Sequence, residues 1–77
     1  MQQLTFNIDG EYVELNQLLK LTGVCDSGGA GKAIVASGDV SVDGKVELRK
    51  TCKIRAGQIV TLGDIKIRVL AADQEAK

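Results

Sequence analysis

The sequence lacks histidine and proline, and it has only two cysteines and two aromatic residues among its 77 positions. Without histidine, the chain has neither the usual general base at neutral pH nor the commonest ligand of transition metals. A zinc site would need two carboxylates beside the distant thiols of Cys25 and Cys52, which is a rare ligand set. We therefore predict no enzymatic activity, no metal and no cofactor.

Long apolar segments are also missing. The longest, 33–36 and 69–72, are far too short to span a bilayer, and the first residues, MQQLTFNIDG, have neither the basic nor the apolar part of a secretory signal. We therefore expect a cytoplasmic protein with no membrane partner and with two reduced thiols, at least one of them buried. The alternative, a disulfide, would suit an exported protein.

A chain of 77 residues has room for a single domain, placed here at 1–77. Its hydrophobic fraction of 44% and charged fraction of 26% are those of an ordinary globular protein. A domain of this size buries only about 60% of its unfolded surface, so we expect neither a large active-site cavity nor a small-molecule substrate. Its size and balanced charge favour a monomer.

Apolar periodicity predicts two short helices. The first ends at Gly23, and the second begins at a cap formed by Asp26 or Ser27 and ends at Gly38. Their apolar faces are expected to consist of Leu15, Leu18, Leu19 and Thr22 in the first helix, and of Ala30, Ala33, Ile34 and Ala36 in the second.

Alternation of apolar and polar residues predicts strands in the rest of the chain. Two short strands would form an N-terminal hairpin, and a meander of short strands would follow Gly38. The turns are expected at Asp9-Gly10, Asp43-Gly44, Ala56-Gly57-Gln58 and Gly63-Asp64. The predicted fold class is therefore α+β, with two short helices packed on a small, mainly antiparallel β-sheet, and a polar tail at 72–77 that would fray.

Charge is distributed unevenly although the net charge is zero. The basic segment, KVELRKTCKIR at 45–55, holds five basic residues and one acidic residue. Strand alternation would place Val46, Leu48, Cys52 and Ile54 inward, with Lys50 near a bend between strands. The outward cations would then be Lys45, Arg49, Lys53 and Arg55. This clustering exceeds what protection of an edge strand needs and favours a polyanionic partner over the alternative of a merely solvated face.

The string GGAGK at 28–32 is not a phosphate loop, because Asp26 and Ala33 stand where that motif needs Gly and Ser or Thr. Two interpretations stay open. Uncovered backbone N–H groups at the helix start could bind phosphate together with Ser27 and Lys32. Alternatively, the small residues let the two helices approach closely.

The two aromatic residues, Phe6 and Tyr12, both lie in the acidic N-terminal part of the sequence. Proteins that read single-stranded RNA stack bases on aromatic side chains, so that mode has little support here. Contacts to phosphates and 2′-hydroxyls need only cations, hydroxyls and backbone amides. Recognition of a structured RNA by its shape is therefore favoured.

The run LNQLLKLTGVCDSGGAGKAIVASGDVSVDGKVELRKTCKIRAGQIVTL, about residues 15–62, resembles the RNA-binding domain named for ribosomal small-subunit protein S-four, also called the αL motif. It follows that family's order of a leucine-bearing helix, a glycine, a serine-initiated helix closed by glycine, V-x-V-D-G and a Gly-Gln-x-Val strand. The pieces VDGKVELRKTCKI and AGQIV are closer to the small stand-alone bacterial subgroup of the YbcJ type.

The resemblance implies non-enzymatic binding of structured RNA, typically ribosomal or transfer RNA, and hence a partner such as the ribosome. The second helix and the following hairpin would form the face, with Ser27 matching the family's helix-start serine. Gly28 stands where many members have arginine, so the cationic contribution would move to the basic segment. The residues predicted to bind RNA are Ser27, Gly28, Lys32, Lys45, Arg49, Lys50, Lys53 and Arg55.

A small protein-interaction module of the ubiquitin-like type is the alternative function, since a small sheet with a Gly-Gln-x-Val strand also suits that class. Sulfur carriers of this type end in Gly-Gly, whereas this chain ends in Gln-Glu-Ala-Lys. We therefore expect protein binding rather than carriage under this alternative.

Overall fold

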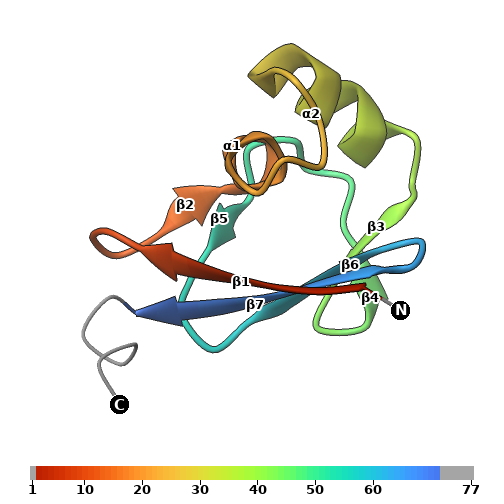
Figure 1. The fold of residues 1–77 in the computed structure, drawn as a ribbon. Coiled ribbons are helices and arrows are strands. Elements are labelled where there is room, and N and C mark those ends of the chain that lie inside the picture. The colour runs from red at the N-terminus through yellow and green to blue at the C-terminus, as the bar shows by residue number, and fades with distance from the viewer. Residues whose placement is uncertain (1, 72–77) are drawn as a thin grey trace.

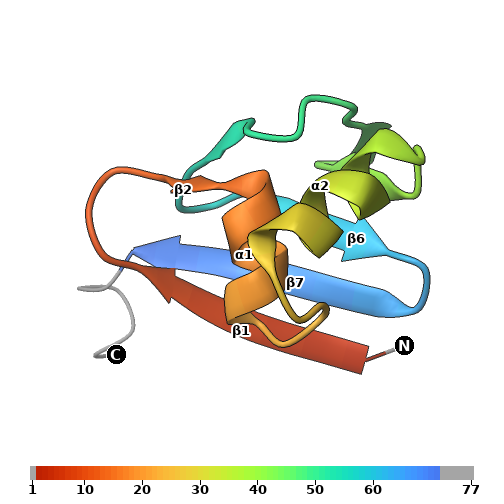
Figure 2. The ribbon, with the colours of Figure 1, turned by 90° about the horizontal axis from the view of Figure 1, so that it is seen from above.

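Two helices cover one face of a five-stranded β-sheet, and a separate two-stranded sheet lies beside them (Figures 1 and 2). The computed structural model describes residues 2–71, so the predicted frayed tail at 72–77 lies outside the described residues. The elements are β1 (Gln2–Ile8), β2 (Val13–Glu14), α1 (Leu15–Leu21), α2 (Gly28–Ala36), β3 (Val40–Val42), β4 (Lys45–Val46), β5 (Lys53–Ile54), β6 (Ile59–Leu62) and β7 (Ile65–Ala71). The α+β fold class is confirmed. No helix within residues 2–71 is long and apolar enough to cross a membrane.

The predicted N-terminal hairpin is wrong. In the larger sheet, ordered β1-β7-β6-β3-β4, β1 pairs in parallel with β7, while the other neighbours are antiparallel. β2 instead pairs antiparallel with β5, with Val13 opposite Ile54. β2 does not fold back along β1 and runs directly into α1 at Leu15. The predicted meander is interrupted because β5 leaves the larger sheet to join β2.

Three of the four predicted turns, at Asp43-Gly44, Ala56-Gly57 and Gly63-Asp64, lie where the sequence predicts them, whereas Asp9-Gly10 forms a bend that leads to β2 and not a hairpin turn. Asp43 and Gly44, between β3 and β4, both have positive φ angles, 53° and 87°, as a two-residue hairpin turn requires. The carboxylate of Asp43 accepts hydrogen bonds from the Ile59 backbone N–H at 3.0 Å and from the Gln58 side chain at 3.3 Å. This turn is therefore fastened to the start of β6.

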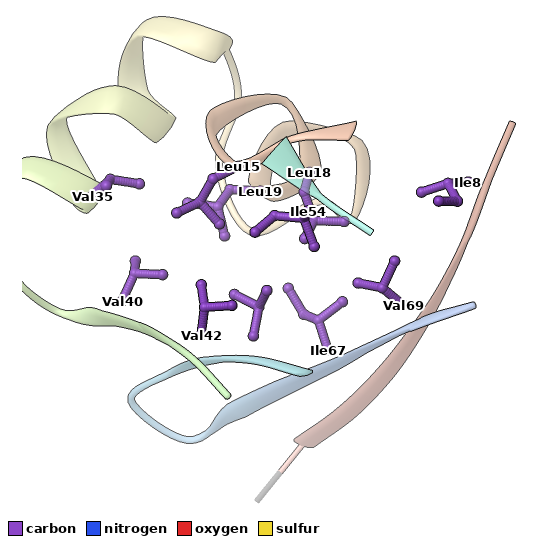
Figure 3. Packing of buried hydrophobic residues seen from close by; sticks show 11 residues of the cluster. Ile8, Leu15, Leu18, Leu19, Val35, Val40, Val42, Ile54, Ile67 and Val69 are labelled. Carbon is purple, nitrogen blue, oxygen red and sulfur yellow. The ribbon is translucent and has the colours of Figure 1, made fainter. Parts of the chain in front are cut away.

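The hydrophobic core lies between the helices and the inner face of the larger sheet (Figure 3). Leu15, Leu18 and Leu19 of α1 are fully buried, as predicted. They pack with Val35 of α2, Ile54 of β5 and the sheet residues Ile8, Val40, Val42, Val60, Ile67 and Val69. Lys66 and Arg68 alternate with the buried residues of β7 and therefore lie on the opposite face of the sheet.

The predicted apolar face of α2 is only partly right. Ala33 and Ala36 are exposed, whereas Gly31 and Val35, one helical turn apart, are the buried residues of this helix. A Cβ atom at position 31 would lie 2.6 Å from the backbone oxygen of Asn16 in α1. Glycine therefore permits the close approach of the two helices at this point, and α2 faces the core through a strip shifted from the predicted one.

Replacing Gly31 with alanine should lower the free energy of unfolding by about 1–3 kcal/mol, because the new methyl group would collide with rigid backbone rather than with a movable side chain. Urea unfolding followed by circular dichroism measures the change. Gly29→Ala is the matched control, since a Cβ atom there has open space and only the Ser27 hydroxyl oxygen, at 3.8 Å, nearby. Equal stability of the two variants would contradict the packing described here.

Candidate nucleic-acid interface

The basic segment is not a single hairpin. It forms β4, leaves the larger sheet as a loop at 47–52, and enters the second sheet as β5 (Figure 1). Val46 and Leu48 were predicted to face inward, but they are 60% and 59% exposed; Ile54 is fully buried as predicted. Val46 pairs with Ser41 and therefore lies on the sheet face opposite the core, whereas Leu48 lies beyond the end of β4, where strand alternation no longer applies. The loop 47–52 is called the basic loop below.

The basic loop is anchored to the N-terminal end of α1. The N-cap residue Glu14 makes no side-chain capping bond. Instead, the backbone N–H of Leu15 donates to the carbonyl of Cys52 at 2.9 Å, and that of Asn16 donates to the carbonyl of Lys50 at 3.1 Å. The first N–H groups of a helix have no partner within the helix, so these bonds satisfy α1 and fix the loop at the same time.

Cations from two distant parts of the chain meet beside this anchor. Lys32 of α2 and the residues from Arg49 to Lys53 line an open surface depression of about 700 Å³, and no acidic residue is among those lining it. Of the predicted site residues, the structure therefore brings together Lys32, Arg49, Lys50 and Lys53. Thr51 and Cys52 also line the depression. They are uncharged, so the charge pattern of the sequence does not predict them, and only the structure shows that they belong to the site.

The remaining predicted residues lie outside the lining of the depression. Ser27 caps α2, its hydroxyl oxygen accepting a hydrogen bond from the Ala30 N–H at 3.1 Å, which confirms the predicted helix start. Gly28 is the first residue of α2, and a Cβ atom there would meet the flexible end of Gln17. Lys45 lies in β4, and Arg55 directly follows β5. Phosphate binding at the start of α2 stays a prediction.

Glu47 holds one edge of the Arg49 side chain. Its carboxylate accepts hydrogen bonds from the Arg49 Nε at 2.9 Å, Nη2 at 3.3 Å and backbone N–H at 3.0 Å. The side-chain bonds from Arg49, followed by its backbone N–H, lower the pKa of Glu47 to about 2. The Arg49 side chain is nevertheless 78% exposed, so its guanidinium group is both oriented and open to a ligand.

Both cysteines are free and partly buried against the core, so the prediction that at least one would be buried is only partly right. Burial and then the nearby Glu47 carboxylate raise the pKa of Cys52, which keeps its thiol protonated at neutral pH. Within residues 2–71, no three His, Cys, Asp or Glu side chains are grouped so as to hold a metal ion. The basic depression is thus a surface that presents cationic side chains.

Tyr12 lies beside the basic segment, although the two are separated in the sequence. The Lys53 Nζ atom is 5.0 Å from the centroid of the Tyr12 ring, and the Arg55 Cζ atom is 6.0 Å from it. The β2–β5 pairing causes this, since Tyr12 directly precedes the Val13–Ile54 pair. Tyr12 belongs to the acidic N-terminal part of the sequence, but the fold sets its ring against two cations of the basic segment. No local sequence signal reveals this long-range pairing.

Comparison with known proteins identifies the family. The family model described as the S4 domain matches residues 6–70, nearly all of the chain. The chain belongs to the S4 domain family. This confirms the resemblance of residues 15–62 and extends it towards both ends.

The chain is similar to two YbcJ proteins. The chain is 50% identical over 60 residues to YbcJ of Escherichia coli (strain K12), a protein named as a candidate for RNA binding, covering 78% of this chain and 86% of that protein. The YbcJ protein of Shigella flexneri, named as uncharacterized, matches with the same figures. The solution structure of E. coli YbcJ, described as revealing an αL motif involved in RNA binding, superposes with a TM-score of 0.66 at 44% identity, covering 92% of this chain and 89% of that one. The YbcJ-type resemblance is therefore confirmed.

The Glu47 carboxylate should contribute to stability in a pH-dependent way. Its pKa of about 2 in the folded protein is below the ordinary value of 4.5, so its contribution is present above pH 4.5 and is lost as the pH falls towards about 2. Glu47→Gln should therefore be slightly less stable than the unaltered protein near neutral pH, and the difference should disappear in acid. Urea unfolding over a pH series measures it. Glu11→Gln, at an exposed position between β1 and β2, is the charge-matched control. A stability difference for Glu47→Gln that stays constant over the pH series would contradict the described role of Glu47.

Proposed function

We propose that this S4 domain is a non-enzymatic RNA-binding module that recognises structured RNA, ribosomal or transfer RNA, chiefly by its shape. The observation that carries the proposal is the basic depression, where Lys32 of α2 joins Arg49, Lys50 and Lys53 with no acidic residue among the lining. Glu47 pairs only with Arg49, so the cluster keeps a mild mutual repulsion that a polyanion would relieve. Phosphates of a folded RNA provide that partner.

The relatives favour RNA over other polyanions. E. coli YbcJ is named as a candidate for RNA binding, and its solution structure is described as containing an αL motif involved in RNA binding. The present chain has the same family domain over residues 6–70. RNA is therefore the polyanion that fits both the charge of the depression and the family.

Shape recognition follows from the residue types at the site. Lysine and arginine side chains contact phosphates whatever the base sequence, and the exposed Thr51 offers a hydroxyl group that can contact a 2′-hydroxyl. The anchored basic loop and the two packed helices hold these groups at fixed positions, so they select phosphates with a matching arrangement. The proposed RNA-binding residues are Ser27, Gly28, Lys32, Lys45, Arg49, Lys50, Lys53 and Arg55.

The proposal describes one domain at 1–77 that acts as a cytoplasmic monomer on structured RNA such as that of the ribosome. The net charge of the whole chain is zero, because ten acidic residues balance ten basic ones. Non-specific attraction to a polyanion should therefore play only a limited role. Affinity would then depend on how many phosphates reach the depression together.

Binding to folded ribosomal RNA fragments over a salt series tests the proposal, with single-stranded RNA and duplex DNA as comparisons. About four phosphate contacts should give a slope of roughly −3 in log affinity against log salt. A steep slope with preference for folded RNA is expected. Binding that is absent or insensitive to salt would contradict the proposal and would direct attention to protein partners, the ubiquitin-like alternative.

The double variant Arg49→Ala/Lys50→Ala should weaken binding to every folded RNA and reduce the salt slope by about 1.5, because two phosphate contacts are lost while the anchoring backbone carbonyls remain. Fluorescence anisotropy with labelled RNA measures both quantities.

The matched control is Lys66→Ala/Arg68→Ala, which removes the same charge from β7, on the sheet face opposite the helices. This control should bind nearly as well as the unaltered protein. Equal losses in the two double variants would show that net charge alone matters and would contradict the site.

A further inference from the structure

Tyr12 is an exposed aromatic residue that the basic depression does not include. Tyr12 is 41% exposed and directly precedes β2. Most large apolar side chains of this protein are buried, and Tyr12 makes no contribution to the buried core. Its ring is therefore partly exposed on the surface, as are the side chains of Leu21, Val46 and Leu48.

The Tyr12 ring is continuous with the basic depression through Lys53. Lys53 lines the depression, and its Nζ atom also lies 5.0 Å from the centroid of the Tyr12 ring. Arg55 approaches the same ring, with its Cζ atom at 6.0 Å. An RNA strand that leaves the depression past Lys53 would therefore reach an exposed aromatic ring with a second cation beside it.

We infer that Tyr12 is a stacking site for an unpaired base, with Lys53 and Arg55 binding the phosphates on either side of that nucleotide. This inference rests on the proposed RNA-binding function and specifies its ligand. The preferred RNA has an unpaired nucleotide next to a helical segment, the helical part being held in the depression and the unpaired base lying on Tyr12. A duplex without unpaired nucleotides would contact only the depression and not the Tyr12 ring.

The chemistry of the three side chains matches this role. An aromatic ring stacks with any base. Lys53 and Arg55 lie over the Tyr12 ring, so a base that stacks there takes their place while the two flexible side chains turn to the flanking phosphates. The pairing of β2 with β5 holds the ring and both cations on one face of a small sheet, together with Glu14 opposite Lys53, because Val13 and Ile54 point to the other face, where Ile54 enters the core. The ring is thus positioned before RNA binds.

A purely structural role for the three side chains makes a different prediction. A lysine or arginine near an aromatic ring can stabilise a protein by itself, and here it would support the short β2–β5 ladder. In that case, loss of the ring would weaken the fold or all RNA binding equally. It would not discriminate between RNAs with and without unpaired nucleotides.

Two RNAs separate these roles: a blunt RNA duplex, and the same duplex with short single-stranded adenosine overhangs on both strands. The proteins compared are the unaltered chain, Tyr12→Leu, which keeps an apolar side chain without a ring, and Tyr12→Phe, which keeps the ring. Circular dichroism and urea unfolding verify the fold of each variant. Anisotropy at one fixed salt concentration gives the affinities.

We expect the unaltered protein and Tyr12→Phe to prefer the overhang RNA by about 5- to 150-fold, the factor that one base–aromatic stack supplies. Tyr12→Leu should lose this preference and still bind the blunt duplex as before. A second readout is available because the chain has one tyrosine and no tryptophan. Its intrinsic fluorescence reports on Tyr12 alone and should be quenched by the overhang RNA more strongly than by the blunt duplex.

Equal binding of both RNAs by the unaltered protein would overturn the inference and leave the proposed function intact. An equal loss for both RNAs in a folded Tyr12→Leu variant would also overturn it, in favour of the structural role. Failure of the unaltered protein to bind either RNA, while it still binds the folded ribosomal RNA fragments, would overturn the inference alone; failure to bind those fragments as well would overturn the proposed function.

Discussion

The site depends on two backbone hydrogen bonds at the start of α1. The N–H groups of Leu15 and Asn16 donate to the carbonyls of Cys52 and Lys50, which caps a helix whose N-cap residue offers no side-chain bond. Helix starts leave several such donors unsatisfied, so the contact stabilises α1 while it holds the basic loop. Since the bonds use only backbone atoms, the side chains of Arg49, Lys50 and Thr51 stay available for a ligand. In the basic loop, backbone atoms therefore support the structure, and side-chain atoms remain available for binding.

The second requirement is the close contact between the helices. Gly31 lets α2 approach the backbone of α1 at Asn16, the same residue whose N–H anchors the basic loop. Asn16 therefore connects α2 on one side with the loop on the other. This arrangement places Lys32 of α2 at the edge of the depression formed by Arg49 to Lys53. The hydrophobic core between the helices and the larger sheet supports the relative positions of α2 and the basic loop (Figure 3).

Local features of the fold could be predicted from the sequence, and long-range pairings could not. The leucine face of α1, the Ser27 cap, and the turns at Asp43-Gly44 and Gly63-Asp64 each follow from a few neighbouring residues. The partners of β1 and β2 do not, because an alternating segment fits several neighbours equally well. That gap explains the incorrect orientation of Val46 and Leu48. It also explains why the contact of Tyr12 with Lys53 and Arg55 emerges only from the structure. Lys32, Arg49, Lys50 and Lys53 were predicted from charge and resemblance together; their meeting in one depression required the structure.

Chemical-shift mapping, which follows the backbone amide signals of the protein as a folded ribosomal RNA fragment is added, can locate the RNA-binding surface. We expect the largest changes at Lys32 and at Arg49 to Lys53, with the amides of Leu15 and Asn16 affected through the anchor, and little change on the outer face of β7 at Lys66 and Arg68. Changes concentrated on that outer face, or spread evenly over the molecule, would show that RNA does not bind at the basic depression.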